Sequence, residues 1–421
     1  MAYALADCNA FYVNAHTLFM PWLRDRAVCV ASNNDGCVVS RNDPAKALGI
    51  KMGAPVFQLK ELMERGELTV FSSNFELYQS LSNRVMATLE ELSPRLSVYS
   101  VDEAFADLSG LPNPYLWGVN ARDTIMQRLG LPIGVGIAPT LTLAKLANWA
   151  AKKWKRRTGC VVEMLCPDKR EKLLRYAPVE EVWGIGLRLA ERLRRDMQID
   201  TAWKLAAADP KTLRRHFNVN VERTARELTG MRCFPFGTSG PECKQMIACT
   251  RSFGNRVTTR EGLQQAVAAF VANAAAKLRQ QGSAANCMQV FARTSLFSQD
   301  MPYSRSAIVE MPYPCADTRD LTSAAMGALE SIYKPGVAFA KAGVILSQFS
   351  DATGWTPDLF GAAPRPQSEA VMKVMDAINA RQGRGTIKLA RDTSTGDWIM
   401  QRRFLTPAYT TRWDGLPRAN S

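Results

Sequence analysis

The chain has 421 residues, 47% hydrophobic and 22% charged, and its lysines and arginines outnumber its aspartates and glutamates by 53 to 39. Its length predicts roughly two to four domains. No apolar run reaches the roughly 20 residues that cross a bilayer, and the first residues lack the basic and apolar regions of a signal peptide, so we expect a cytoplasmic protein with no membrane partner.

The formal charge of +14 favours a polyanionic partner, because neutralised phosphates release counterions. An excess of basic residues that serves only solubility would explain this charge equally well. Its distribution favours nucleic acid: basic residues interleave with Trp154 over 152–157 and recur over 188–195, beyond a glycine turn.

The ten cysteines are scattered, and neither their spacing nor the two histidines, His16 and His216, predicts a zinc site. We expect reduced and mostly buried thiols, because a disulfide framework is uncommon in a chain of this size without a signal peptide.

Strands and helices alternate in the first 165 residues. A strand is predicted over roughly Tyr3 to Cys8, and a hairpin over 96–108 turns near Asp102 and Glu103. A helix over about 115–129, a strand over 131–137, a helix from a Thr140 cap to about residue 155 and more strand near 160–164 follow. This order suits a sheet covered by helices on one face.

The remaining segments predict two further regions. Residues 21–74 read as an insertion in short pieces, and residues 170–232 as helices, two of them joined by Trp183-Gly184-Ile185-Gly186. From residue 244 a second βαββαβ order appears, with a helical stripe over 263–278. Past residue 349 the chain reads as a linker and tail. We therefore predict an α+β protein in which two sheet domains bracket a helical one.

Three carboxylates are the candidates for chemistry. Asp7 ends the first strand, and Asp102 and Glu103 can converge on it only if the backbone turns at the hairpin, because neighbouring strand residues face opposite ways. Clustered carboxylates are costly to bury without cations, and their hard oxygens suit Mg²⁺. Two such ions would serve phosphoryl or nucleotidyl transfer. The alternative is a surface Asp-Glu pair with Asp7 as a strand-end cap; we expect Asp107 to be structural.

Several ordered motifs resemble those of Y-family DNA polymerases, and in particular the UmuC branch. The likeness runs from about residue 3 to beyond 410. The segments that carry it are 7–12 (DCNAFY), 32–40 (SNNDGCVVS), 45–53 (AKALGIKMG), 99–105 (YSVDEAF), 134–138 (GVGIA), 144–148 (AKLAN), 182–186 (VWGIG), 340–344 (AKAGV) and 409–412 (YTTR).

The resemblance implies a right-hand polymerase that copies a template past lesions with low fidelity. Its parts would be a ferredoxin-like palm (1–20 and 75–165), small fingers (21–74), a helical thumb with a helix-hairpin-helix (166–235), a second ferredoxin-like little finger (242–350), and a linker, clamp-type peptide and tail (351–421). Primer-template DNA and dNTPs would be its substrates. A processed UmuD-like dimer, a RecA filament and the sliding clamp would be its partners.

Roles for single residues follow from the same resemblance. Asp7, Asp102, Glu103 and the Cys8 carbonyl would bind two Mg²⁺ ions, with Mn²⁺ a possible substitute, and Tyr12 would be the steric gate against ribonucleotides. The predicted nucleotide contacts are Phe11, Ser40, Lys46 and Lys152, and the roof over the nascent base pair is Cys37 and Val39. The predicted DNA contacts are Gly184, Gly186, Arg188, Arg251 and Ser252, and the clamp contacts are Leu359 and Phe360.

Some positions depart from the family pattern. His16 and its neighbours replace a more usual Ser-Cys-Glu, Asp43 stands where several relatives have Tyr, and Thr356 replaces the leading Gln of the clamp peptide. Without the resemblance, Tyr12 would read as a core aromatic and the lysines as solvated helix charges. Three rival functions stay open at this point: a nucleotide cyclase, a catalytically silent DNA-binding or checkpoint protein on the same fold, and a helix-hairpin-helix glycosylase or lyase.

Overall fold

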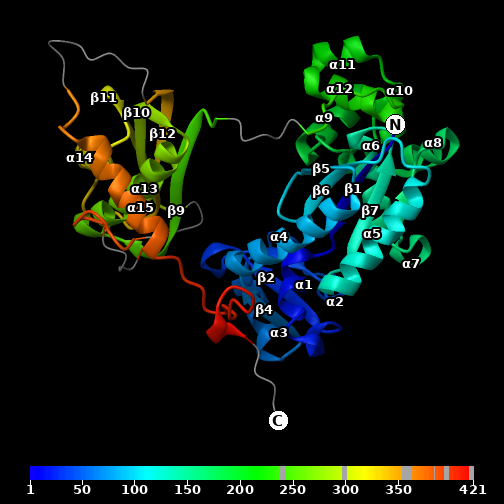
Figure 1. Ribbon diagram of the computed structural model, residues 1–421, viewed down its shortest axis with the longest axis horizontal. Helices are drawn as coiled ribbons and strands as arrows, with labels where there is room; N and C mark the ends of the chain where they lie inside the picture. The colour runs from blue at the N-terminus through cyan, green and yellow to red at the C-terminus, as the bar shows by residue number, and fades with distance from the viewer. Residues whose placement is uncertain (238–242, 296–300, 353–362, 384, 393–397, 417–421) are drawn as a thin grey trace. The chain divides into compact units, whose positions relative to one another are not determined.

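The computed structural model describes residues 1–237, 243–295, 301–352, 363–383, 385–392 and 398–416. The chain divides into two compact units, which are considered separately (Figure 1). The first comprises Met1–Ser32, Gly36–Gly240 and Phe404–Ser421, and the second comprises Asn33–Asp35 and Pro241–Arg403. In the described part of the chain, no helix has the length and apolar character that crossing a bilayer requires.

The first unit is built around a sheet of order β5-β6-β1-β7-β8. Its strands are β1 (Tyr3–Cys8), β5 (Arg95–Val98), β6 (Glu103–Asp107), β7 (Ile133–Ala138) and β8 (Val161–Glu163). The apolar β1 runs between two antiparallel neighbours, β6 and β7, and only β7 and β8 are parallel. This arrangement confirms the predicted strand, hairpin and strand–helix succession.

Helices cover both faces of this sheet, so the expectation of a single covered face was wrong. Ala4 and Ala6 of β1 pack with α4 (Phe75–Leu92) and α5 (Pro114–Leu129). Leu5, whose side chain points the other way, packs with α6 (Leu141–Lys153). The short α1 (Phe11–Thr17) follows β1, and α7 (Lys155–Thr158) follows α6.

Glycine allows α6 to approach the sheet closely. A methyl group at Gly136 would lie only 2.1 Å from the backbone nitrogen of Asn148, so no larger residue fits there. The Asn148 side chain donates a 2.7 Å hydrogen bond to the Gly134 carbonyl. Thr140 caps the helix, as predicted, by accepting from the Leu143 amide.

Residues 21–74 form a small subdomain around a sheet of order β3-β2-β4. The strands are β2 (Ala27–Ala31), β3 (Val38–Arg41) and β4 (Leu68–Ser72), with the helices α2 (Asp43–Ala47) and α3 (Lys60–Glu64) and the 3-10 turns η1 (Pro21–Leu23), η2 (Asn33–Asp35) and η3 (Val56–Leu59). Its core contains Cys29, Val38 and Leu68.

Helices dominate the region after β8, as the sequence predicted. They are α8 (Pro167–Tyr176), α9 (Leu187–Met197), α10 (Ala202–Ala207), α11 (Pro210–His216) and α12 (Val219–Thr229), with the 3-10 turn η4 (Val179–Glu181). Buried Glu227 of α12 accepts from the Thr142 amide at 2.9 Å and from the Cys233 and Phe234 amides. This carboxylate therefore fixes the first turn of α6.

The second unit contains a four-stranded antiparallel sheet of order β11-β10-β12-β9. Its elements are β9 (Met246–Val257), α13 (Arg260–Gln280), β10 (Ser283–Arg293), β11 (Ser304–Cys315), α14 (Thr318–Ile332) and β12 (Phe339–Asp351). This βαββαβ succession is the predicted one, and the predicted α13 stripe, including Leu263 and Val267, is buried.

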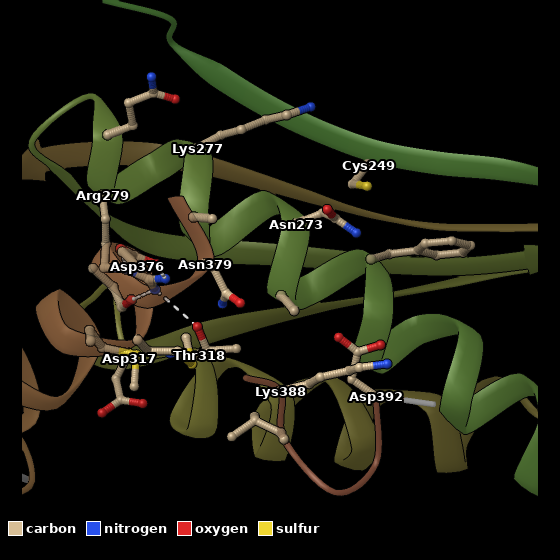
Figure 2. Close-up of a pocket in the computed structure, with 18 of the residues that line it drawn as sticks. Cys249, Asn273, Lys277, Arg279, Asp317, Thr318, Asp376, Asn379, Lys388 and Asp392 are labelled. Atoms are coloured by element: carbon tan, nitrogen blue, oxygen red, sulfur yellow. Dashed lines mark hydrogen bonds and ion pairs between the residues drawn. The ribbon is translucent and has the colours of Figure 1, made fainter. Parts of the chain in front are cut away.

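The region predicted as linker and tail contains a helix that the sequence analysis did not anticipate, α15 (Ser368–Gln382). Arg279 of α13 makes two 2.7 Å hydrogen bonds to Asp376 of α15 and a third bond to Thr318, as Figure 2 shows. Together with residues of 385–392 and 398–400, the two helices line a cavity of about 1200 Å³. Farther along, residues 404–416, which include η5 (Trp413–Gly415), belong to the first unit and begin beside β4, where the Ser72 amide donates to the Phe404 carbonyl (Figure 1).

Candidate active site

Asp7 and Glu103 face each other across neighbouring strands. They are paired residues in the antiparallel register of β1 and β6. Paired residues in such a ladder project from the same face of the sheet. Both side chains therefore project on the face that α6 covers.

Asp102 lies in the turn that precedes β6. Its backbone carbonyl accepts a 2.9 Å hydrogen bond from the Cys8 amide, which holds the turn against the end of β1. The Ser100 hydroxyl donates to the Asp102 carboxylate at 2.6 Å. The turn required for Asp102 and Glu103 to approach Asp7 is thus present.

Two lysines of α6 neutralise two of these carboxylates. Lys145 lies 3.0 Å from Glu103, and Lys152, two helical turns later, forms an ion pair with Asp7. The Lys145 ammonium also lies over the Tyr99 ring, 4.3 Å from its centroid. Lys145 and Lys152 therefore lie on one face of α6, and that face points at the acidic groups.

Burial destabilises the ionised form of Asp7. Desolvation raises the pKa of Asp7 to about 7, the positive charge of Lys152 opposes the rise, and the nearby negative charges of Glu103 and Asp102 add to it. Burial, with the charges of Asp7 and Asp102 adding to it, also raises the pKa of the Cys8 thiol. The end of β1 therefore has an excess of negative charge that a further cation would relieve.

The carboxylate oxygens of Asp7, Asp102 and Glu103 are chemically suited to bind a divalent ion. Carboxylates are the ligands that Mg²⁺ prefers, and Asn9, beside Cys8, has a buried side-chain oxygen with no hydrogen-bond partner in the described structure. Within the described ranges, however, no three acidic, His or Cys side chains are already arranged as a metal site, because two carboxylates hold lysines instead.

Tyr12, the second residue of α1, lies close enough to this acidic cluster for the Asp102 charge to act on its hydroxyl. Its ring stacks on buried Tyr78 of α4, with the centroids 4.2 Å apart and the planes 12° from parallel. Burial raises the pKa of Tyr12, and the Asp102 charge adds to that rise. Phe11, the other predicted contact on α1, is buried in the core, so its side chain is not accessible to a nucleotide.

The predicted contacts in residues 21–74 lie on β3 and α2. Ser40 is buried, Val39 is half-buried against the core of the large sheet, and Cys37 pairs in a bridge with Pro55. Lys46 is exposed and lies 3.0 Å from Asp43. Asp43 also pairs with Lys155 of α7, and the hydrogen bond from Lys155 is the main cause that lowers the pKa of Asp43.

Gly184 and Gly186 border the loop before α9, where backbone groups are accessible. Gly184 has a φ of +87°, which favours glycine, and a methyl group at Gly186 would contact nothing within 4 Å. Ile185, between them, is buried, whereas Arg188 in the first turn of α9 is exposed. Arg251 and Ser252 of β9 belong to the second unit and are exposed. Leu359 and Phe360 lie outside the described residues.

Comparison with known proteins places this site in a family. The impB/mucB/samB family model matches residues 6–149, the C-terminal domain model of that family matches 244–359, and a domain of unknown function, DUF4113, matches 369–419. Protein UmuC of Salmonella typhimurium is 44% identical over 99% of both chains. The chain belongs to the impB/mucB/samB family.

Some more distant relatives are named as DNA polymerases. DNA polymerase IV 1 of Halalkalibacterium halodurans is 30% identical over 61% of this chain and 60% of its own. A structure titled as an insertion ternary complex of Dbh DNA polymerase shares the fold, with a TM-score of 0.52, 16% identity, and coverage of 82% of this chain and 98% of that one. The predicted α+β polymerase fold and the UmuC-type Y-family resemblance are both confirmed.

As a UmuC-type member of the impB/mucB/samB family, the chain is a DNA-directed DNA polymerase of the error-prone, lesion-bypass class, and polymerases of this kind generally require divalent metal. Nothing in these comparisons favours the catalytically silent alternative.

Sequence reasoning missed several contacts of the site: Tyr78 beneath Tyr12, Glu103 as the partner of Lys145, and Asp43 as the partner of two lysines. The sequence singled out Glu103 and Asp43 but not their pairing with lysines. The contacts Tyr12–Tyr78, Glu103–Lys145 and Asp43–Lys155 join residues far apart in the sequence, so no local pattern indicates them. The spacing of Asp43 and Lys46, three apart on α2, could have indicated that pair.

Proposed function

We propose that Asp7, Asp102 and Glu103, with the Cys8 carbonyl, bind the two Mg²⁺ ions of a nucleotidyl-transfer site, where Mn²⁺ can substitute. The observation that carries this proposal is the pairing of Asp7 with Glu103 across β1 and β6, with Asp102 in the adjoining turn. When bound, two such ions activate a primer 3′-hydroxyl and stabilise the leaving pyrophosphate.

The α6 lysines have a second role in this proposal. Lys152 lies against Asp7, so a triphosphate bound beside Asp7 is within reach of its ammonium. We assign Lys152 and Lys46 to the phosphates of the incoming nucleotide, with Ser40 and the Phe11 backbone completing its contacts. Because Lys46 is paired with exposed Asp43, it must exchange that partner for the phosphates.

Tyr12 acts as the steric gate. Its ring is half-buried in the first turn of α1, and burial, with the charge of the proposed metal ligand Asp102 adding to it, raises the pKa of its hydroxyl. A flat ring beneath the sugar clashes with a 2′-hydroxyl and so favours deoxynucleotides. Cys37 and Val39 form a small-residue roof over the nascent base pair.

DNA contacts are proposed at two places. The backbone N–H groups around Gly184 and Gly186, with Arg188, bind a phosphate of the duplex, and the open surface around Gly186 supports this role. Arg251 and Ser252 on β9 bind duplex phosphates without reading sequence. The domain boundaries predicted from the sequence for palm, fingers, thumb and little finger are part of the same proposal.

The partners are proposed from family membership. They are a processed UmuD-like dimer, a RecA filament and a sliding clamp that binds Leu359 and Phe360. Because a polymerase works where its template is, we propose a cytoplasmic enzyme that associates with the nucleoid when engaged.

Substitution of Asp102 tests the metal site. Asp102→Asn keeps an acceptor for Ser100 but removes the charge, and Asp102→Ala removes both. We expect each variant to lose primer extension by at least about 100-fold, in the range of lost transition-state electrostatics, while affinity for primer-template DNA stays within about twofold of wild type, because phosphate contacts dominate that affinity.

The matched control is Asp107→Ala. Asp107 is the last residue of β6 and pairs with Tyr3 at the far end of β1; its side chain accepts a 3.0 Å hydrogen bond from the Ser109 amide and lies 3.7 Å from exposed Arg95. It should retain extension. Extension by Asp102→Asn at a rate near that of the wild type would contradict the assignment.

A further inference from the structure

A continuous set of contacts links the Tyr12 ring to the C-terminal segment, residues 404–412. Tyr12 stacks on Tyr78, and the Tyr78 hydroxyl lies 2.8 Å from Nε2 of His16. The other ring nitrogen of His16, Nδ1, lies 3.1 Å from the Thr406 hydroxyl. Three contacts therefore separate a residue near the C-terminus from the proposed gate.

The middle of this set is rigid. His16 is fully buried, Tyr78 is 2% exposed, and the His16 imidazole stacks on the Phe71 ring with centroids 4.6 Å apart. Burial lowers the pKa of His16 to about 4, so the ring is neutral near pH 7. A neutral imidazole has one donor and one acceptor nitrogen, so both hydroxyl partners are needed to satisfy it.

The C-terminal segment is fastened at the start of α4, the helix that carries Tyr78. Asn74 caps α4 by accepting from the Leu77 amide, and its side-chain nitrogen donates to the Thr406 and Pro407 carbonyls at 3.1 and 3.2 Å. The same helix and its surroundings make further contacts with this segment: Ser72 with Phe404, Phe19 stacked on Tyr409, Ser80 with Thr410, and Glu76 with Thr411.

We propose that residues 404–412 form a brace for the steric gate, and that Thr406, His16 and Tyr78 are positioning residues that fix the Tyr12 ring. This inference rests on the proposed gate role of Tyr12. It also gives a role to part of the segment matched by the domain of unknown function.

The physical reason is that a steric gate works by a clash of short range. The Tyr12 ring has one face stacked on Tyr78, so movement of Tyr78 moves the support of the gate. Removing the Thr406 hydroxyl leaves a buried His16 nitrogen unpaired, which favours rearrangement of the His16 and Tyr78 pair. A looser ring admits a 2′-hydroxyl more easily but still accepts a deoxynucleotide.

The test compares two threonines of the same segment. Thr406→Val removes the hydroxyl that contacts His16 and also accepts from the Asn74 side-chain nitrogen, which keeps its bonds to the Thr406 and Pro407 carbonyls. Thr410→Val removes a hydroxyl that contacts Ser80 and the nearby Ala408 carbonyl. The measured quantity is the ratio of kcat/KM for dNTP to kcat/KM for the matching rNTP. Because both substrates meet the same enzyme preparation, loss of folded protein cancels from this ratio.

We expect Thr406→Val to lower the discrimination ratio roughly fivefold, the effect of one lost hydrogen bond, with kcat for dNTP within about twofold of wild type. Thr406→Ser, which keeps the hydroxyl, and Thr410→Val should both retain the wild-type ratio. An unchanged ratio in Thr406→Val, or equal losses in the Thr406→Val and Thr410→Val variants, would overturn the brace.

Two more variants separate the brace from the gate. Tyr12→Ala should lose most of the discrimination; if it does not, the gate assignment fails independently of the Thr406 result. Tyr78→Phe keeps the stacked ring but loses the bond to His16, and should match Thr406→Val. Combining Tyr78→Phe with Thr406→Val should add little, because both act through His16; fully additive losses would argue against one shared path.

Discussion

Asp7 and Glu103 each face a lysine of α6, and both carboxylates are largely buried: their side chains are 13% and 18% exposed. A buried carboxylate that loses its only cation costs more than the ion pair contributes. When ionised, the two acidic groups are therefore stabilised by the two lysines or by bound cations; Asp7, whose pKa burial raises to about 7, can also be neutralised by a proton. This stabilisation explains why lysines, which can extend to phosphates as well, stand on that face of α6.

His16 makes folding stability depend on pH. Its pKa is lowered by burial from the ordinary 6.5 to about 4, so the unfolded chain takes up a proton at a higher pH than the folded chain. The His16 contribution to stability is complete above pH 6.5 and is lost as the pH falls toward 4. At pH 5 the loss should be about 2 kcal/mol.

Urea denaturation of wild type and His16→Gln between pH 7.5 and 4.5 measures this effect. The substitution removes the titrating group, so the difference in unfolding free energy between the two proteins should shrink as the pH falls. The carboxylates titrate in the same way in both proteins, so their contributions cancel from the difference in unfolding free energy. A difference independent of pH would show that the pKa of His16 is the same in the folded and unfolded chain.

The three carboxylates were predictable because their positions follow from local rules: a strand end, a hairpin turn and the alternation of strand residues. His16, Tyr78 and Thr406 were not predictable in the same way. His16 and Tyr78 are 62 residues apart, and His16 and Thr406 are 390 apart. Nothing local in the sequence indicates that a buried polar residue finds its partner at such a separation.

Helix α6 positions the lysines because it lies unusually close to β7. Gly136 is the residue that permits the approach, and an alanine there would place its methyl group 2.1 Å from the Asn148 nitrogen. We expect Gly136→Ala to lower the unfolding free energy by about 1–3 kcal/mol, the usual cost of overpacking, and to weaken the Lys145 and Lys152 ion pairs by displacing α6.

Gly186→Ala is the matched control for stability, because a methyl group at Gly186 meets nothing within 4 Å. Its unfolding free energy should change by less than about 1 kcal/mol. If a urea titration shows equal destabilisation by both substitutions, the close contact between α6 and β7 at Gly136 is not what makes Gly136→Ala destabilising.

Element prediction succeeded where a pattern is local and failed where packing decides. The Thr140 cap and the α13 stripe were predicted, because each depends on side chains within a few turns. The placement of α6 on the second face was not, because it depends on Gly134 and Gly136 accepting a helix. Helix α15 was also missed; its only buried residue is Met372, and its ion pair with Arg279 joins residues 97 apart.

At the scale of the whole molecule, charge is the main determinant of DNA affinity. With a formal charge of +14, the protein should neutralise several phosphates. If about six are neutralised, affinity for duplex DNA should fall about a thousandfold between 50 and 200 mM salt, and hardly change with sequence.

Fluorescence anisotropy over a salt series measures this slope. Arg188→Ala, at the proposed phosphate site, should reduce the slope by about one unit. Arg195→Ala on the same helix is the control, because that guanidinium is already paired with Asp196 at 2.7 Å. A marked sequence preference, or a flat salt dependence, would contradict phosphate-based binding.

The central claim is that Asp7, Asp102 and Glu103 gather two divalent ions, and counting those ions tests it most directly. Mn²⁺ bound to the protein in a ternary complex with dNTP and a primer lacking its 3′-hydroxyl can be counted by electron paramagnetic resonance. We predict two coupled ions per protein, roughly 3.5–4 Å apart, and their loss in Asp102→Asn but not in Asp107→Ala. Uncoupled ions, or the same two ions in Asp102→Asn, would contradict the account.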